Sequence, residues 1–129
     1  MKALVLVAHG SRKDSSNKEV ALLSEKMNSL IDKEFDIVKH GFLELAEPSI
    51  PGAINHCCDL GATEVTVVPY FLSAGRHVTE DIPEEVEKAK IQNPEVEMII
   101  SQYLGARSEI ADLLIKAALF VQGGRGPAL

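Results

Sequence analysis

Short apolar runs without polar alternation recur along this chain, and between them apolar residues follow helical spacing. The runs at 2–8 and 64–72 are the clearest. A strand buried on both faces of a parallel sheet has this composition, whereas a strand with one solvated face alternates. Strand and helix patterns that alternate predict a parallel sheet covered by helices. We therefore expect an α/β fold with three layers around a four-stranded parallel sheet.

The boundaries of these elements follow from the same patterns. We expect strands at about residues 2–8, 36–43, 64–72 and 96–103. We expect helices at about residues 17–34, 50–60, 80–92 and 108–121. The 129 residues suit one domain, at 1–121, followed by a flexible glycine-rich tail at 122–129. Right-handed crossovers favour the strand order 2-1-3-4, in which chain order reverses between the first and third strands.

Local signals predict how three of the helices begin or end. Ser16 and Glu19 form a capping-box pattern for the first helix, Gly61 is a C-cap for the second, and Thr79 is an N-cap for the third. In the fourth helix one apolar stripe is expected to face the core. Its members are Ile110, Leu113, Leu114, Ala117 and Val121.

Charge and cysteine content narrow the classes of function. A formal net charge of −6 argues against general nucleic-acid binding. No stretch reaches the roughly 18 apolar residues of a membrane span, and the first apolar run reads as a buried strand rather than a signal peptide. The only cysteines, Cys57 and Cys58, are adjacent and cannot form a disulfide framework. We expect a cytoplasmic protein.

Three metal-binding side chains follow strands that the predicted order makes neighbours. His9 follows the first strand, Glu44 the second, and His77 lies shortly after the third. Carboxyl ends of parallel strands share one edge, where open α/β sheets bind ligands. Two imidazoles and a carboxylate suit a divalent first-row metal, and imidazole also accepts protons near neutral pH. The alternatives are a turn histidine bonded to carbonyls for His9 and a salt-bridged surface residue for Glu44.

Residues near these histidines suggest an anionic ligand. Arg12, Lys13 and Arg76 make the local field positive, although they also read as ordinary solvated cations. Ser11 is a possible nucleophile, but no G-x-S-x-G elbow surrounds it. A loop hydrogen bond is the better interpretation of that serine.

Three long motifs carry a resemblance to a known family. They are LVAHGSR at 6–12 with Asn17, FLELAEPSIP at 42–51, and VPYFLSAGRHVTEDIP at 68–83. The chain resembles the small class II tetrapyrrole chelatases of the short CbiX type, which are sirohydrochlorin cobaltochelatases with ferrochelatase relatives. One departure is the turn Leu104-Gly105-Ala106-Arg107-Ser108, where relatives often carry a histidine.

The resemblance implies a chelatase-like fold and an enzyme that inserts cobalt, iron or nickel into sirohydrochlorin, in cobalamin or siroheme synthesis. It implies metal contact by His9, Glu44 and His77 and requires no organic cofactor. Ser11, Arg12, Lys13 and Arg76 are the candidates for binding the carboxylates of the tetrapyrrole.

Two other functions fit part of the pattern. A metal or tetrapyrrole carrier would use the same ligands without turnover. A histidine-phosphatase-like enzyme also has a His-Gly pair after its first strand, but there arginine precedes the histidine, and here Ala8 does.

We also expect a homodimer. A large flat tetrapyrrole needs walls on several sides, and a second copy related by a two-fold axis would supply one. The fourth strand and fourth helix are the candidate interface.

Overall fold

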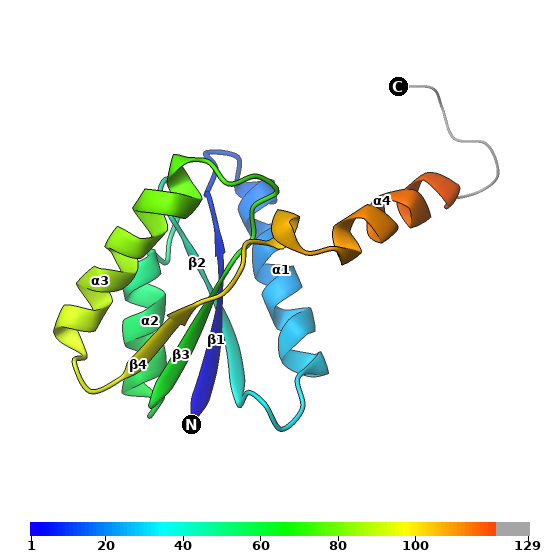
Figure 1. Cartoon of the computed structure of the whole chain (residues 1–129). Helices are drawn as coiled ribbons and strands as arrows, with labels where there is room; N and C mark the ends of the chain where they lie inside the picture. Colours follow the sequence, from blue (N-terminus) through cyan, green and yellow to red (C-terminus); the bar gives the residue numbers. More distant parts are fainter. Residues whose placement is uncertain (121–129) are drawn as a thin grey trace.

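The computed structural model describes residues 1–120 and confirms the predicted sheet. Four parallel strands lie in the order β2-β1-β3-β4 (Figure 1). The strands are β1 (Lys2–Ala8), β2 (Ile37–Phe42), β3 (Glu64–Pro69) and β4 (Glu97–Ile100). The helices are α1 (Asp14–Leu30), α2 (Ile50–Asp59), α3 (Ile82–Gln92) and α4 (Glu109–Leu119). Chain order reverses between β1 and β3, where the sequence placed the switch point.

The two faces of the sheet are covered unequally (Figure 1). On one face α2 and α3 bury the main apolar core, in which Val5, Ile54 and Ile82 are inaccessible to solvent. On the other face α1 is the one helix of residues 1–120 that lies against the sheet. Its Ser24 hydroxyl lies 3.1 Å from Nδ1 of His40, which comes from β2.

Two of the predicted caps are wrong and one is confirmed. α1 begins at Asp14, before the Ser16–Glu19 pair, and its N-cap residue Lys13 makes no side-chain capping bond. Thr79 lies inside a π-helical turn, His77–Asp81, that runs directly into α3, and its hydroxyl donates to the Gly75 carbonyl. Gly61 does follow α2 at φ +106°, a conformation that glycine adopts without steric cost.

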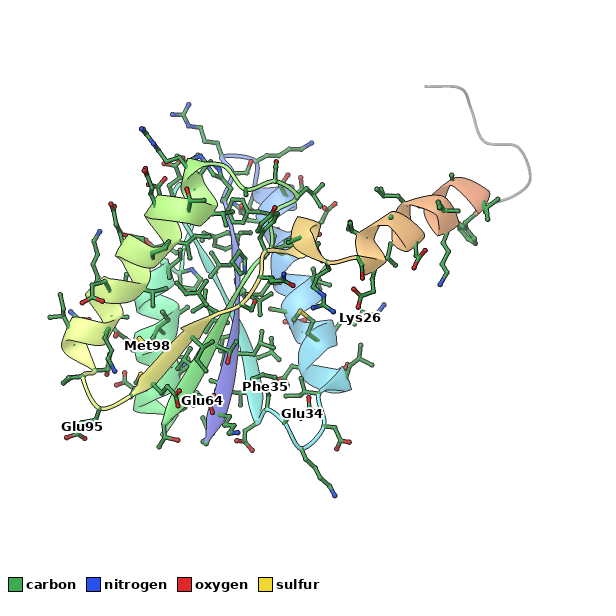
Figure 2. The ribbon with its side chains drawn as sticks, viewed as in Figure 1. Lys26, Glu34, Phe35, Glu64, Glu95 and Met98 are labelled. Carbon is green, nitrogen blue, oxygen red and sulfur yellow. The ribbon has the colours of Figure 1, made fainter. Side chains whose placement is uncertain are left out.

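The prediction that the apolar stripe of α4 faces the core is wrong. This helix extends away from the sheet, and its side chains reach into solvent (Figures 1 and 2). Leu113 is 54% exposed and Leu114 64%. The connection from β4 directs the helix outward, so within residues 1–120 its apolar stripe has no core to pack against. Val121 and the predicted tail at 122–129 lie outside the described residues.

The helices of the described residues were also compared with the length and apolarity that a membrane span needs. No helix within residues 1–120 is long and apolar enough to cross a bilayer.

Candidate metal-binding site

Backbone hydrogen bonds at the carboxyl end of β1 bring His9 and Glu44 together. The pairing of β1 with β2 continues past both strands, because the amide of Leu43 donates to Ala8 at 2.9 Å and the amide of Glu44 to His9 at 3.0 Å. Nε2 of His9 then lies 3.1 Å from Oε1 of Glu44. Both side chains are about half exposed, so this pair is open to an incoming ligand.

Gly10 makes this close approach possible. It has a φ of +95°, and a Cβ atom added there would lie 1.8 Å from the carbonyl oxygen of Glu44. Its own carbonyl oxygen lies 3.0 Å from Nδ1 of His9 and fixes the orientation of the ring.

His77 reaches the same edge from the π-helical turn that precedes α3. Its ring centroid is 4.7 Å from that of His9, with the rings inclined at 66°. Nδ1 of His77 donates to Oδ2 of Asp81 at 2.8 Å, which leaves Nε2 with its lone pair. A carboxylate that orients a histidine in this way is typical of metal sites.

His77 and Glu44 line a strongly acidic pocket of about 260 Å³. It is lined by Leu43, Glu44, His77, Asp81, Glu84 and Glu85. Carboxylates gathered in one concavity lower the potential there and favour a cation. Within residues 1–120, no three His, Cys, Asp or Glu side chains gather closely enough to hold a metal ion. His9, Glu44 and His77 thus share an edge as two imidazole–carboxylate pairs, not as a closed ligand set.

Three of the acidic residues in this pocket were not singled out from the sequence. They are Asp81, Glu84 and Glu85. Their positions in the sequence are typical of charges near the start of a helix or on its solvated face. The available signal was spacing, since Asp81 follows His77 by one helical turn, the distance at which side chains meet.

The basic residues and Ser11 occupy the loops around the histidines. Ser11 is held within its loop, because its amide donates to Oδ1 of Asn17 and its hydroxyl accepts from the amide of Lys13. These bonds agree with the loop interpretation of the serine. Arg12 is exposed, and neither it nor Lys13 forms an ion pair with any residue in the described range. Arg76 is exposed and pairs with Glu80 at 3.1 Å.

Two further residues of types that can bind metals, His40 and Cys57, lie away from this edge of the sheet. His40 is packed beneath α1, where burial lowers its pKa and keeps the ring neutral. Burial, with a smaller effect from neighbouring Cys58, raises the pKa of Cys57 to about 11. A thiol with that pKa is not a thiolate at neutral pH, which makes it a poor nucleophile.

Comparisons with known proteins place the chain in a family. Residues 3–119 match the family model described as CbiX. The chain is 34% identical to a sirohydrochlorin ferrochelatase from Priestia megaterium over 90% of its length, although it spans only 43% of that protein. It is 35% identical to a sirohydrochlorin cobaltochelatase from Methanocaldococcus jannaschii, over 92% of this chain and 98% of that protein.

A solved structure extends the comparison to three dimensions. The sirohydrochlorin chelatase SirB from Bacillus subtilis subspecies spizizenii, in complex with cobalt, superposes with a TM-score of 0.83 at 29% identity. The superposition covers 92% of this chain and 50% of SirB.

We expect Gly10→Ala to disrupt the site and the fold around it. The methyl group would collide with the Glu44 carbonyl, so the two loops must separate. Gly61→Ala is the matched control, because Gly61 also has a positive φ but has open space around it, and this strain alone costs about 1–3 kcal/mol. Thermal unfolding should show a larger loss for Gly10→Ala. Equal losses would mean that the close approach to Glu44 contributes nothing.

We expect Asp81→Asn to weaken Co²⁺ binding by roughly 10–100-fold, the usual effect of losing a carboxylate that orients a metal-binding histidine. Glu80→Gln is the control, since Glu80 is adjacent and pairs with Arg76 instead. Calorimetric titration with Co²⁺ measures both variants. If they bind alike, Asp81 has no role in orienting His77.

Proposed function

The chain belongs to the CbiX family, and from its paired histidines we propose that it inserts a divalent metal ion into sirohydrochlorin. The observation that carries this proposal is the 4.7 Å approach of His9 and His77, each bonded to its own carboxylate at the switch point of the sheet. Cobalt, iron and nickel all suit imidazole and carboxylate ligands. The reaction needs no organic cofactor.

The chemistry requires ligands for the metal and acceptors for protons. When M²⁺ enters the macrocycle, it forms bonds to the ring nitrogens, and two pyrrole N–H bonds break with release of two protons. The ion must also exchange its water for protein ligands and then for the macrocycle. Neutral imidazole meets both needs near pH 7.

His9 and Glu44 act as a pair in this proposal. Both ring nitrogens of His9 face oxygen acceptors, Gly10 O and Glu44 Oε1. An N–H on either ring nitrogen therefore has an oxygen to donate to, and a metal ion that binds at Nε2 would take the place of the hydrogen there. Glu44 then neutralises part of the charge of the ion and is placed to pass the proton on.

His77 is the more available acceptor. Its hydrogen bond to Asp81 directs the proton onto Nδ1, so Nε2 offers a lone pair to the metal or to a pyrrole proton. The acidic pocket beside it, with Glu84 and Glu85, concentrates cations at the point where the metal must enter.

The loops around the histidines provide surfaces for the macrocycle. Leu45, next to Glu44, is 53% exposed, and Leu72, on the loop that leads to His77, is 69% exposed. These side chains suit the flat ring. Arg12, Lys13 and Arg76 are proposed to bind its peripheral carboxylates by charge-assisted hydrogen bonds. A second copy of the chain would close this open edge, and we therefore propose that the enzyme works as a homodimer.

Replacing the site residues should abolish insertion without unfolding the protein. We expect His9→Ala, His77→Ala and Glu44→Gln each to lower the rate by about 10²–10⁴-fold, as is usual for acid–base groups. The assay follows the tetrapyrrole absorption spectrum with Co²⁺, Fe²⁺ and Ni²⁺ against the uncatalysed rate. His56→Ala is the control, because His56 is exposed on α2, outside the site.

Two results would contradict the proposal. A His9→Ala, His77→Ala double variant that keeps the full rate would refute the site. Tight binding of metal and sirohydrochlorin with no rate above background would instead identify a carrier.

Substrate affinity should fall as salt is added, because exposed ion pairs are screened over about 10 Å at 0.1 M ionic strength. The fall in affinity with salt should be less steep for an Arg12→Ala, Lys13→Ala double variant. It should be unchanged for Lys33→Ala, because Lys33 lies beyond the opposite end of α1. Fluorescence titration with metal-free sirohydrochlorin gives the affinities. An affinity that does not vary with salt would remove these cations from the substrate site.

A further inference from the structure

Asn17, near the start of α1, is bonded to the loop that carries His9. Its side-chain amide meets both main-chain groups of Ser11. Oδ1 accepts from the Ser11 amide at 3.0 Å, and Nδ2 donates to the Ser11 carbonyl at 2.7 Å. Asn17 is partly buried, and a carboxamide can donate and accept at the same time. The two bonds therefore hold the main chain of Ser11 in one orientation.

The Ser11 amide belongs to the same peptide group as the Gly10 carbonyl. This peptide bond is trans, and because a peptide group is planar, its N–H and C=O point in opposite directions from one rigid unit. On one side the N–H donates to Asn17. On the other side the Gly10 carbonyl oxygen lies 3.0 Å from Nδ1 of His9. Fixing the N–H therefore also fixes the carbonyl that faces the imidazole.

Gly10 gives this peptide group little stiffness of its own. It has a φ of +95°, and glycine has more conformational freedom than any other residue. The chain is instead held from outside. Before Gly10, the His9 carbonyl accepts from the Glu44 amide at 3.0 Å, and after it Asn17 holds Ser11. Without Asn17 the Gly10–Ser11 peptide would be free to rotate away from His9.

Two oxygen atoms compete for the single N–H of a neutral His9 ring. Gly10 O faces Nδ1, and Oε1 of Glu44 lies 3.1 Å from Nε2. A proton on Nδ1 leaves Nε2 with a lone pair for a metal ion, whereas a proton on Nε2 blocks that atom. A hydrogen bond to the N–H of a peptide polarises the group and strengthens its carbonyl as an acceptor. The bond from Asn17 therefore favours the metal-binding tautomer.

We propose that Asn17 is a positioning residue for His9, which acts through the Gly10–Ser11 peptide to hold the proton on Nδ1 and keep Nε2 available to the metal ion. Asp81 has the corresponding role at His77, where its Oδ2 lies 2.8 Å from Nδ1. Metal-binding histidines are commonly oriented by either a carboxylate or a main-chain carbonyl. The importance of this tautomer for metal insertion rests on the proposed function, whereas the effect of Asn17 on the ring does not.

The first test measures the tautomer of His9 in the full-length, metal-free protein, by NMR of the ring nitrogens at a pH above the titration range of histidine. In the wild type the Nδ1–H form should predominate. Asn17→Leu has a side chain of similar size without either bond, and it should shift the population toward Nε2–H. Asn17→Ala gives the same comparison should the leucine variant not fold. Asn17→Asp keeps an acceptor for the Ser11 amide, so it should retain the wild-type tautomer.

Asn28→Leu is the matched control. Asn28 is also on α1 and also bonds to main chain, since its Oδ1 accepts from the Val38 amide at 2.8 Å. It lies about three turns further along the helix. Thermal unfolding should show a loss of stability in both leucine variants, but the His9 tautomer should change only in Asn17→Leu.

The second test is calorimetric titration with Co²⁺. We expect Asn17→Leu to weaken binding by roughly 10–100-fold, as is usual when the group that orients a metal-binding histidine is lost, and Asn28→Leu to bind as the wild type does. An Asn17→Leu protein that is less stable yet keeps the wild-type tautomer would overturn the proposal, because Asn17 would then only close the loop. A wild-type ring with its proton on Nε2 would overturn it too. If the tautomer changes as expected but the wild type inserts no metal into sirohydrochlorin, the proposed function fails and the role of Asn17 at His9 stands.

Discussion

The hydrogen-bond ladder between β1 and its two neighbours is the constraint on which the rest of this structure depends. β1 is buried on both faces and paired along its length with β2 and β3. Its pairing with β2 continues to Glu44, so the backbone places the Glu44 carboxylate beside His9. Gly10 allows the two loops to touch. The position of the site is therefore determined by main-chain geometry, which is stiffer than any set of exposed side chains.

Charge is distributed to suit a cation and an anion at one edge. The acidic pocket beside His77 favours a cation, while Arg12 and Lys13 lie exposed on the neighbouring loop. Each imidazole has its own carboxylate partner. In the proposed mechanism these separate pairs are ligands that an incoming ion would bring together. A chelatase needs such replaceable ligands, since a metal bound in a closed cage would not be passed on.

The two faces of the sheet are covered unequally. Two helices bury one face, and on the other face α1 is the one described helix and leaves an apolar groove beside it. Residues 1–120 therefore expose apolar surface at two places, on α4 and at this groove.

The sequence by itself determined the strands, their order and the edge at which the histidines meet, because burial on both faces and the handedness of crossovers leave few arrangements. It also identified His9, Glu44 and His77 as neighbours. It did not predict Asp81 as the partner of His77, since the local pattern read as a helix cap and the π-helical turn depends on packing. It also placed α4 against its own core. Periodicity shows that a helix has an apolar face, but only the tertiary structure, through the Gly105 turn, decided that no part of the described chain covers it.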